Sequence, residues 1–215
     1  QRAGLTKYCP DRLVGNYNIQ TLDQMVYTGQ SVSAKAGAVG FVALADLSST
    51  SKGLEIYDQP TNTLSSYLGG FASPSCLGAC WDQSGNAYGI LLSGGSYYVV
   101  SIDAKAKVQR WLSGALGATT VVAPSGICYG NGSIWVLVTN AANTDVYLYK
   151  LDSTSGVIST GTHIYTTARK LQPTAELTAA VPSSVISYCS GVLGMGFLSG
   201  WVQLYNTITS TATEI

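Results

Sequence analysis

The stretch GICYGNGSIWVLV, from Gly126 to Val138, holds two short apolar runs separated by the polar turn Gly-Asn-Gly-Ser. Two apolar runs around such a turn predict a β-hairpin, because Asn-Gly readily adopts the backbone conformation of a tight hairpin turn. Whether this hairpin stands alone or is one copy of a repeat decides the fold.

The same pattern occurs elsewhere in the chain. LGACWDQSGNAYGILL repeats the order of small residues, cysteine, aromatic residue, polar turn and apolar run, and an alternating strand that ends in Asp or Asn follows each copy. The residue at that strand end recurs in five places: Asp23, Asp58, Asp103, Asp152 and Asn206. Asp and Asn side chains bond backbone N–H groups of their own turn, so we expect these five to cap turns and not to catalyse.

Units of four strands and about 40–50 residues have the size of propeller blades. WDQSGNAYGILL and YGNGSIWVLV resemble the first hairpin of blades in quinoprotein-like and related β-propellers, and YLYKLDSTSGVIS resembles the second hairpin. The resemblance covers nearly the whole chain and implies an all-β fold, a small β-propeller. It lies in the repeat pattern alone, so it implies no subfamily and no subfamily's activity.

We expect a single β-propeller domain over residues 1–215, with five blades, or four if the N-terminal segment merges with the last unit. The expected units are 1–32, which is partial, then 33–72, 73–118, 119–167 and 182–215, with an insertion at 168–182. The N-terminal segment is expected to close the ring against the last blade, because an open ring leaves strand edges and a blade face uncovered.

The charge composition limits the classes of partner. Only 10% of the 215 residues are charged, and 11 basic residues balance 11 acidic ones. The chain has no basic stripe and no apolar run of about 18 residues, so we expect no nucleic-acid partner and no membrane span. A net charge of zero removes the repulsion between copies, which favours association with itself or with another surface protein.

A surface built from hydroxyls and amides is typical of a secreted protein, an extracellular surface or a virion. The sequence begins at Gln1 and not at Met. Removal of a signal peptide and a shortened chain both explain that start.

The five cysteines divide into two groups. Cys80, Cys128 and Cys189 occupy matched positions on the expected inner strands of neighbouring blades, so we expect buried thiols that are not bridged to one another. Cys9 and Cys76 lie outside that pattern and are the candidates for a disulfide in an oxidising compartment.

Residues for catalysis or metal binding are few. The single histidine, His163, lies in an expected outer strand, away from any central site. Cys76 and Cys80 have no second pair at zinc-ligand spacing, and the loop from Asp82 to Asn86 lacks the acids of a calcium site. We therefore expect no catalytic residues, no metal and no cofactor.

Aromatic residues near the repeated turns are the remaining candidates for ligand binding, because their rings could stack on sugars or pack between blades. The candidate binding residues are Trp81, Asp82, Tyr129, Asn131 and Tyr188. Asn131-Gly132-Ser133 is also a glycosylation acceptor pattern.

Three functions remain open from the sequence. The first is a non-enzymatic extracellular or surface structural module of a filament, a surface layer or a virion coat, acting by protein–protein association. The alternative is a lectin-like, glycan-binding propeller. The third is a propeller enzyme, which would need acids, histidine or metal ligands clustered on one face.

Overall fold

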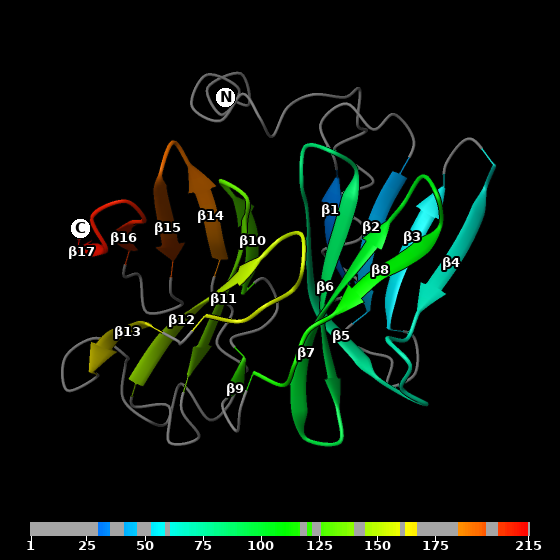
Figure 1. The fold of residues 1–215 in the computed structure, drawn as a ribbon, viewed down its shortest axis with the longest axis horizontal. Helices are drawn as coiled ribbons and strands as arrows, with labels where there is room; N and C mark the ends of the chain where they lie inside the picture. Colours follow the sequence, from blue (N-terminus) through cyan, green and yellow to red (C-terminus); the bar gives the residue numbers. More distant parts are fainter. Residues whose placement is uncertain are drawn as a thin grey trace.

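The computed structural model of the chain describes residues 30–34, 41–46, 53–58, 61–116, 120–121, 126–139, 145–159, 162–166, 185–196 and 202–214. Over these residues the protein is all-β, with four antiparallel sheets side by side (Figure 1). The segments 1–29 and 168–182 lie outside the described residues, and so do Cys9 and most of the predicted partial unit.

Within each sheet four strands follow one another in sequence order. The first sheet consists of β1 (Gln30–Ala34), β2 (Phe41–Asp46), β3 (Leu54–Asp58) and β4 (Thr63–Tyr67). The second sheet consists of β5 (Ser75–Trp81), β6 (Asn86–Ser93), β7 (Ser96–Asp103) and β8 (Val108–Leu112).

The third sheet consists of β10 (Ile127–Gly130), β11 (Ser133–Thr139), β12 (Asp145–Asp152) and β13 (Thr162–Thr166), and the short β9 (Thr120–Val121) also pairs with β11. The fourth sheet consists of β14 (Val185–Cys189), β15 (Val192–Gly196), β16 (Val202–Asn206) and β17 (Thr211–Glu214). Because β1 begins at Gln30, the predicted boundary between residues 32 and 33 falls inside this strand.

The sheets pack face to face, and alternation along each strand supplies both faces. In β6, Ala87 and Leu91 point towards the first sheet, whereas Tyr88 and Ile90 point towards the third. The first strand of each sheet lies next to its counterpart, with β5 between β1 and β10, and β10 against β14. Because successive side chains of a strand point to opposite faces, a strand of an inner sheet packs against the sheets on both sides.

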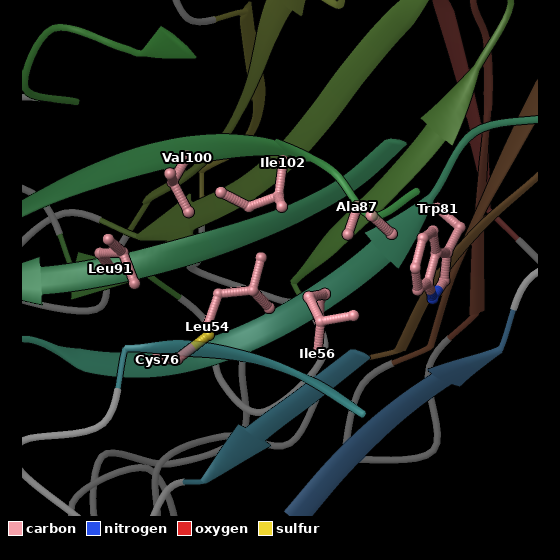
Figure 2. Packing of buried hydrophobic residues seen from close by; sticks show 10 residues of the cluster. Leu54, Ile56, Cys76, Trp81, Ala87, Leu91, Val100 and Ile102 are labelled. Atoms are coloured by element: carbon pink, nitrogen blue, oxygen red, sulfur yellow. The ribbon is translucent and has the colours of Figure 1, made fainter. Parts of the chain in front are cut away.

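Three apolar clusters fill the spaces between neighbouring sheets. Leu54 and Ile56 of the first sheet meet Leu91, Val100 and Ile102 of the second (Figure 2). The second and third sheets share a cluster made of Cys80, Tyr88, Ile90, Val99, Leu116, Ile127, Ile134, Val136, Val138 and Leu151. The third and fourth sheets share Cys128, Trp135, Leu137, Leu148, Ile186, Leu193, Met195 and Tyr205.

The apolar positions of the repeated strands predict nine residues buried between blades, and this prediction is confirmed wherever their side chains are described. The buried residues are Ile56, Leu91, Val100, Ile102, Ile134, Val136, Leu148 and Leu151. Val202 was also predicted to be buried, but its side chain lies outside the described part.

The predicted turn caps are confirmed in the hairpins after β7, β12 and β16. The Asp103 carboxylate accepts a hydrogen bond from the Ala106 amide at 2.9 Å. Asp152 accepts from the amides of Thr154 and Ser155, at 3.0 and 2.8 Å. In a tight turn, some backbone amides have no backbone acceptor and would otherwise bond to water. Each of these side chains supplies such an acceptor.

Candidate functional site

One end of the sheets carries the turns that join first to second and third to fourth strands, and we call it the turn face. Cross-sheet contacts hold these ends together: Lys107, in the turn after β7, forms a 3.0 Å ion pair with Asp58 at the end of β3. All five non-glycine residues with positive φ in the described part lie in turns of this face: Asn62, Lys107, Asn131, Ser190 and Ser210. The candidate binding residues are at this face too.

Trp81, Tyr129 and Tyr188 occupy the same position in three successive sheets. They pair with Ala87, Ile134 and Leu193, the second residues of β6, β11 and β15. The structure therefore aligns the three aromatic residues that the sequence analysis selected along the first strands, next to the turn face.

Each of the three rings packs towards the preceding sheet. Trp81 belongs to the cluster between the first two sheets and is 8% exposed (Figure 2). The ring of Tyr129 is parallel to that of Tyr88, with centroids 6.3 Å apart. The ring of Tyr188 covers Gly130, where a Cβ atom would overlap it. Packing between sheets therefore accounts for much of the surface of these rings.

Asp82 organises the turn between β5 and β6. Its Oδ1 accepts hydrogen bonds from the backbone amides of Ser84, Gly85 and Asn86, and its Oδ2 accepts from Asn86 Nδ2 and the Tyr88 hydroxyl. Burial favours the neutral acid and would raise the pKa, but the bonds from Asn86, Tyr88 and Ser84 outweigh it and lower the pKa of Asp82. Asp82 is therefore a charged carboxylate whose oxygens are already occupied.

The Tyr88 hydroxyl lies at the seam between the second and third sheets. It donates to Asp82 at 2.8 Å, and Arg110 Nη1 approaches it at 3.4 Å. Burial, followed by the negative charge of Asp82, raises the pKa of Tyr88, so the phenol stays protonated. This network was not predicted from the sequence, because it joins residues of several strands and leaves no local signal.

The second sheet also holds the turn after β12 directly. Trp111 Nε1 donates to the Ser153 carbonyl at 3.1 Å, and Arg110 Nη1 lies 3.4 Å from the same oxygen. The Trp111 ring lies against Gly156, which has φ +72° and where a Cβ atom would be 2.5 Å from the ring. These contacts fix the outer turn of one sheet to the outer strand of its neighbour.

Asn131 is exposed at the tip of the turn between β10 and β11, with φ +49°. The following Gly132 is also exposed and has φ +73°. The predicted hairpin is thus confirmed in register, with Gly130 opposite Ser133. Glycosylation of Asn131 stays a prediction.

The prediction of buried thiols is correct for Cys80 and Cys128 and wrong for Cys189, which is exposed. Cys128 pairs with Trp135, two positions into the hairpin, whereas Cys189 pairs with Val192 beside the turn. The residue of β14 that matches Cys128 is therefore Ser187, which pairs with Gly194. Cys189 thus lies two residues beyond that position, at the end of β14 beside the exposed turn, which explains its exposure.

The predicted disulfide is not formed at Cys76 in the structure, where the thiol is free. Cys76 is fully buried in the cluster between the first two sheets, and its Sγ lies 3.6 Å from the Gly78 carbonyl. Burial raises the pKa of this thiol to about 12. Such a group behaves as a small apolar side chain.

Four large apolar side chains are exposed among the described residues, and each belongs to the outer hairpin of a different sheet. They are Leu64, Val108, Val157 and Ile208, with exposed fractions of 52%, 51%, 65% and 81%. Each follows the turn-capping Asp or Asn of its sheet by two to six residues. We call these four residues the outer apolar set, and the sequence analysis did not select them.

Chemical groups for catalysis are sparse in the described part. None of its His, Cys, Asp and Glu side chains form a group of three placed to share a metal ion. His163 lies in β13 opposite Tyr147. No helix within the described ranges is long and apolar enough to cross a membrane.

Comparisons by sequence gave no match: no family model and no curated protein resembles the chain. Solved structures do resemble it. The Dos1 propeller matches with a TM-score of 0.56 at 12% identity, over 86% of this chain and 46% of the other. The Swd1 β-propeller domain of Myceliophteria thermophila matches with a TM-score of 0.51 at 14% identity, over 82% and 52%.

A subtype N10 neuraminidase-like protein of A/little yellow-shouldered bat/Guatemala matches with a TM-score of 0.54 at 12% identity, over 86% of this chain and 57% of the other. The chain thus spans about half the length of these three proteins. At such low identity the likeness shows the fold alone. With its repeated four-stranded sheets, this chain is a β-propeller repeat protein without an assigned subfamily.

Proposed function

We propose that the chain is a non-enzymatic extracellular or surface module, of a filament, surface layer or virion coat, that associates with itself or with another surface protein through its outer hairpins. One observation carries the proposal: an exposed apolar side chain recurs in the outer hairpin of all four described sheets. Single exposed apolar residues are ordinary, but one in the outer hairpin of every described sheet offers several contact points in the same part of each unit.

The outer strands support the same proposal. β4, β8 and β17 are the last strands of their sheets, and most of their described residues are exposed. Charged residues and proline usually protect such edges from pairing with other chains. Here β4 has no charged residue and β8 has only Arg110.

The proposal is tested by comparing the association of the wild-type chain with a variant that carries Leu64→Ser, Val108→Thr, Val157→Thr and Ile208→Ser. We expect sedimentation analysis to show a specific complex for the wild type, and association at least about tenfold weaker for the variant, since about 1.4 kcal/mol of lost burial is enough. All four residues are exposed, so melting temperatures should agree.

A matched control replaces exposed polar residues of two outer strands, Gln109→Ala and Thr213→Ala, and should associate like the wild type. A wild-type chain that stays monomeric and binds no surface protein contradicts the proposal. If the wild-type chain instead stays monomeric and binds simple sugars, and if Tyr129→Ala or Tyr188→Ala abolishes this binding, the lectin alternative holds. Catalytic turnover would support the enzyme alternative.

We further propose that the ring has five units and that residues 1–29, the part of the predicted unit 1–32 that precedes β1, close it against the last sheet. Residues 30–67 and 185–214 already supply four strands each, so neither end sheet needs the N-terminal segment to reach the usual blade size. Deleting residues 1–29 should therefore lower the melting temperature and speed amide exchange in β14–β17. Unchanged melting and exchange would favour four units.

A further inference from the structure

The turn Asn131-Gly132 differs chemically from the rest of the chain. Asn131 is the one asparagine in the 215 residues that is followed by glycine. An asparagine side chain carries an electrophilic amide carbon close to the backbone nitrogen of the next residue. Glycine puts no side chain in the way of that nitrogen.

The other described asparagines are held by hydrogen bonds. Asn62 Oδ1 accepts from the Tyr57 hydroxyl at 2.8 Å, and Asn86 Nδ2 donates to Asp82 at 2.6 Å. Asn206 Oδ1 accepts from the amides of Ile208 and Thr209. Among the hydrogen bonds of the described residues, none fixes the exposed side chain of Asn131.

The nitrogen of Gly132 is equally accessible. A Cβ atom placed on Gly132 would meet nothing within 4 Å, so the space around the residue is open. Its amide donates none of the turn hydrogen bonds in the described part, whereas its carbonyl accepts from the Ser153 amide at 3.1 Å. Both reacting groups therefore face water.

We propose that Asn131-Gly132 is a site of spontaneous covalent modification on the turn face. The Gly132 backbone nitrogen, after losing its proton to water, attacks Cγ of Asn131. A nitrogen–carbon bond forms, the bond from Cγ to Nδ2 breaks, and Nδ2 leaves as ammonia. Water then opens the cyclic imide at either carbonyl and yields aspartate or isoaspartate at position 131. Water is the only co-reactant.

The modification changes the turn face in two ways. It adds a negative charge to a chain whose formal net charge is zero. Isoaspartate also lengthens the backbone by one methylene group, which displaces the Gly132 carbonyl from the Ser153 amide. That hydrogen bond joins the inner turn of the third sheet to the outer turn that precedes Val157, so the change reaches the outer apolar set.

The test follows the complete folded chain, produced in a cytoplasmic host so that no glycan is attached, at mildly alkaline pH. Peptide mapping by mass spectrometry and labelling with an isoaspartyl methyltransferase locate the product. We expect isoaspartate and aspartate to accumulate at residue 131, faster at higher pH, while Asn62, Asn86 and Asn206 stay intact. Asn131→Gln should abolish the product over the same time, because its ring closure is slower.

Gly132→Ala is the second variant and should slow the reaction by hindering the nitrogen. Its backbone is strained at φ +73°, so its folding is checked by circular dichroism, and Asn131→Gln keeps the test independent of it. A synthetic peptide of residues 126–138 serves as the unfolded reference. The proposal is overturned if Asn131 of the folded chain stays intact while this peptide converts, or if it converts no faster than Asn62.

Discussion

Asp82 accepts hydrogen bonds from three backbone amides and two side chains at the seam between the second and third sheets. Because these bonds favour the charged carboxylate, the folded pKa lies below the ordinary value. A depressed folded pKa means that the unfolded chain binds more protons in acid. The stability that Asp82 contributes is thus complete above the unfolded pKa of about 4 and is lost as pH falls through the folded pKa.

We therefore predict that the free energy of unfolding falls below about pH 4, and that Asp82→Asn flattens this fall while lowering stability at neutral pH. Asparagine keeps the size but loses the charge that the turn amides and the Tyr88 hydroxyl stabilise. Denaturant titrations of both chains at several pH values make the measurement. An acid profile identical to that of the wild type would show that other carboxylates dominate.

Ile134 is fully buried in the cluster between the second and third sheets. We predict that Ile134→Ala costs about 2–4 kcal/mol in the free energy of unfolding, because it removes buried methyl groups and leaves a cavity. Ile208→Ala is the control, since Ile208 is 81% exposed, and should cost less than about 0.5 kcal/mol. Chemical denaturation measures both, and equal losses would mean that the faces of β11 are misassigned.

At the scale of elements, Trp111 links the outer strand β8 to the turn after β12. We predict that Trp111→Phe costs about 0.5–1.5 kcal/mol, the usual net value of one hydrogen bond, since the ring still packs but Nε1 is gone. Gly156→Ala should cost more, because its Cβ would be 2.5 Å from the ring at φ +72°. Thermal unfolding ranks the two variants, and the reverse order would contradict this account of the seam.

The turns were the part of the elements that the sequence predicted well. Asp103, Asp152 and Asn206 cap their own turns, so the whole interaction lies within a few residues and leaves a local signature. The position of Cys189 was predicted wrongly because a cysteine was used to align the units, although the two-residue turn sets the register. The contact between Tyr88 and Ser153 joins residues 65 positions apart, so it depends on how sheets pack and has no local pattern.

The candidate site divides in the same way. The common position of Trp81, Tyr129 and Tyr188 follows from the repeat, so the sequence was sufficient to select them. Their packing towards the preceding sheet depends on the distance between sheets, which no single unit encodes. The outer apolar set has a sequence feature in common, an apolar residue shortly after the Asp or Asn of each unit. Core residues are also apolar, however, and only the assembled sheets show which apolar side chains are exposed.

For the whole molecule, burial divides the described thiols into two reactivity classes. We predict that an alkylating reagent modifies Cys189 in the folded protein, while Cys76, Cys80 and Cys128 react only after denaturation. Burial raises the pKa of Cys76 and Cys80, which lowers the thiolate fraction further. Mass spectrometry after alkylation without reduction measures the pattern. Rapid labelling of Cys128 would show that the sheets separate more easily than the packing implies.

Each sheet is assembled from one continuous stretch of chain, and each apolar cluster joins sheets that are neighbours in sequence. During synthesis, a ribosome that has released residues up to 116 has therefore delivered two complete sheets and the first cluster between them. The nascent chain then needs no distant downstream segment to bury those side chains, and growth proceeds by adding one layer at a time. A pause in translation between sheets would expose one sheet face instead of a whole unfolded core.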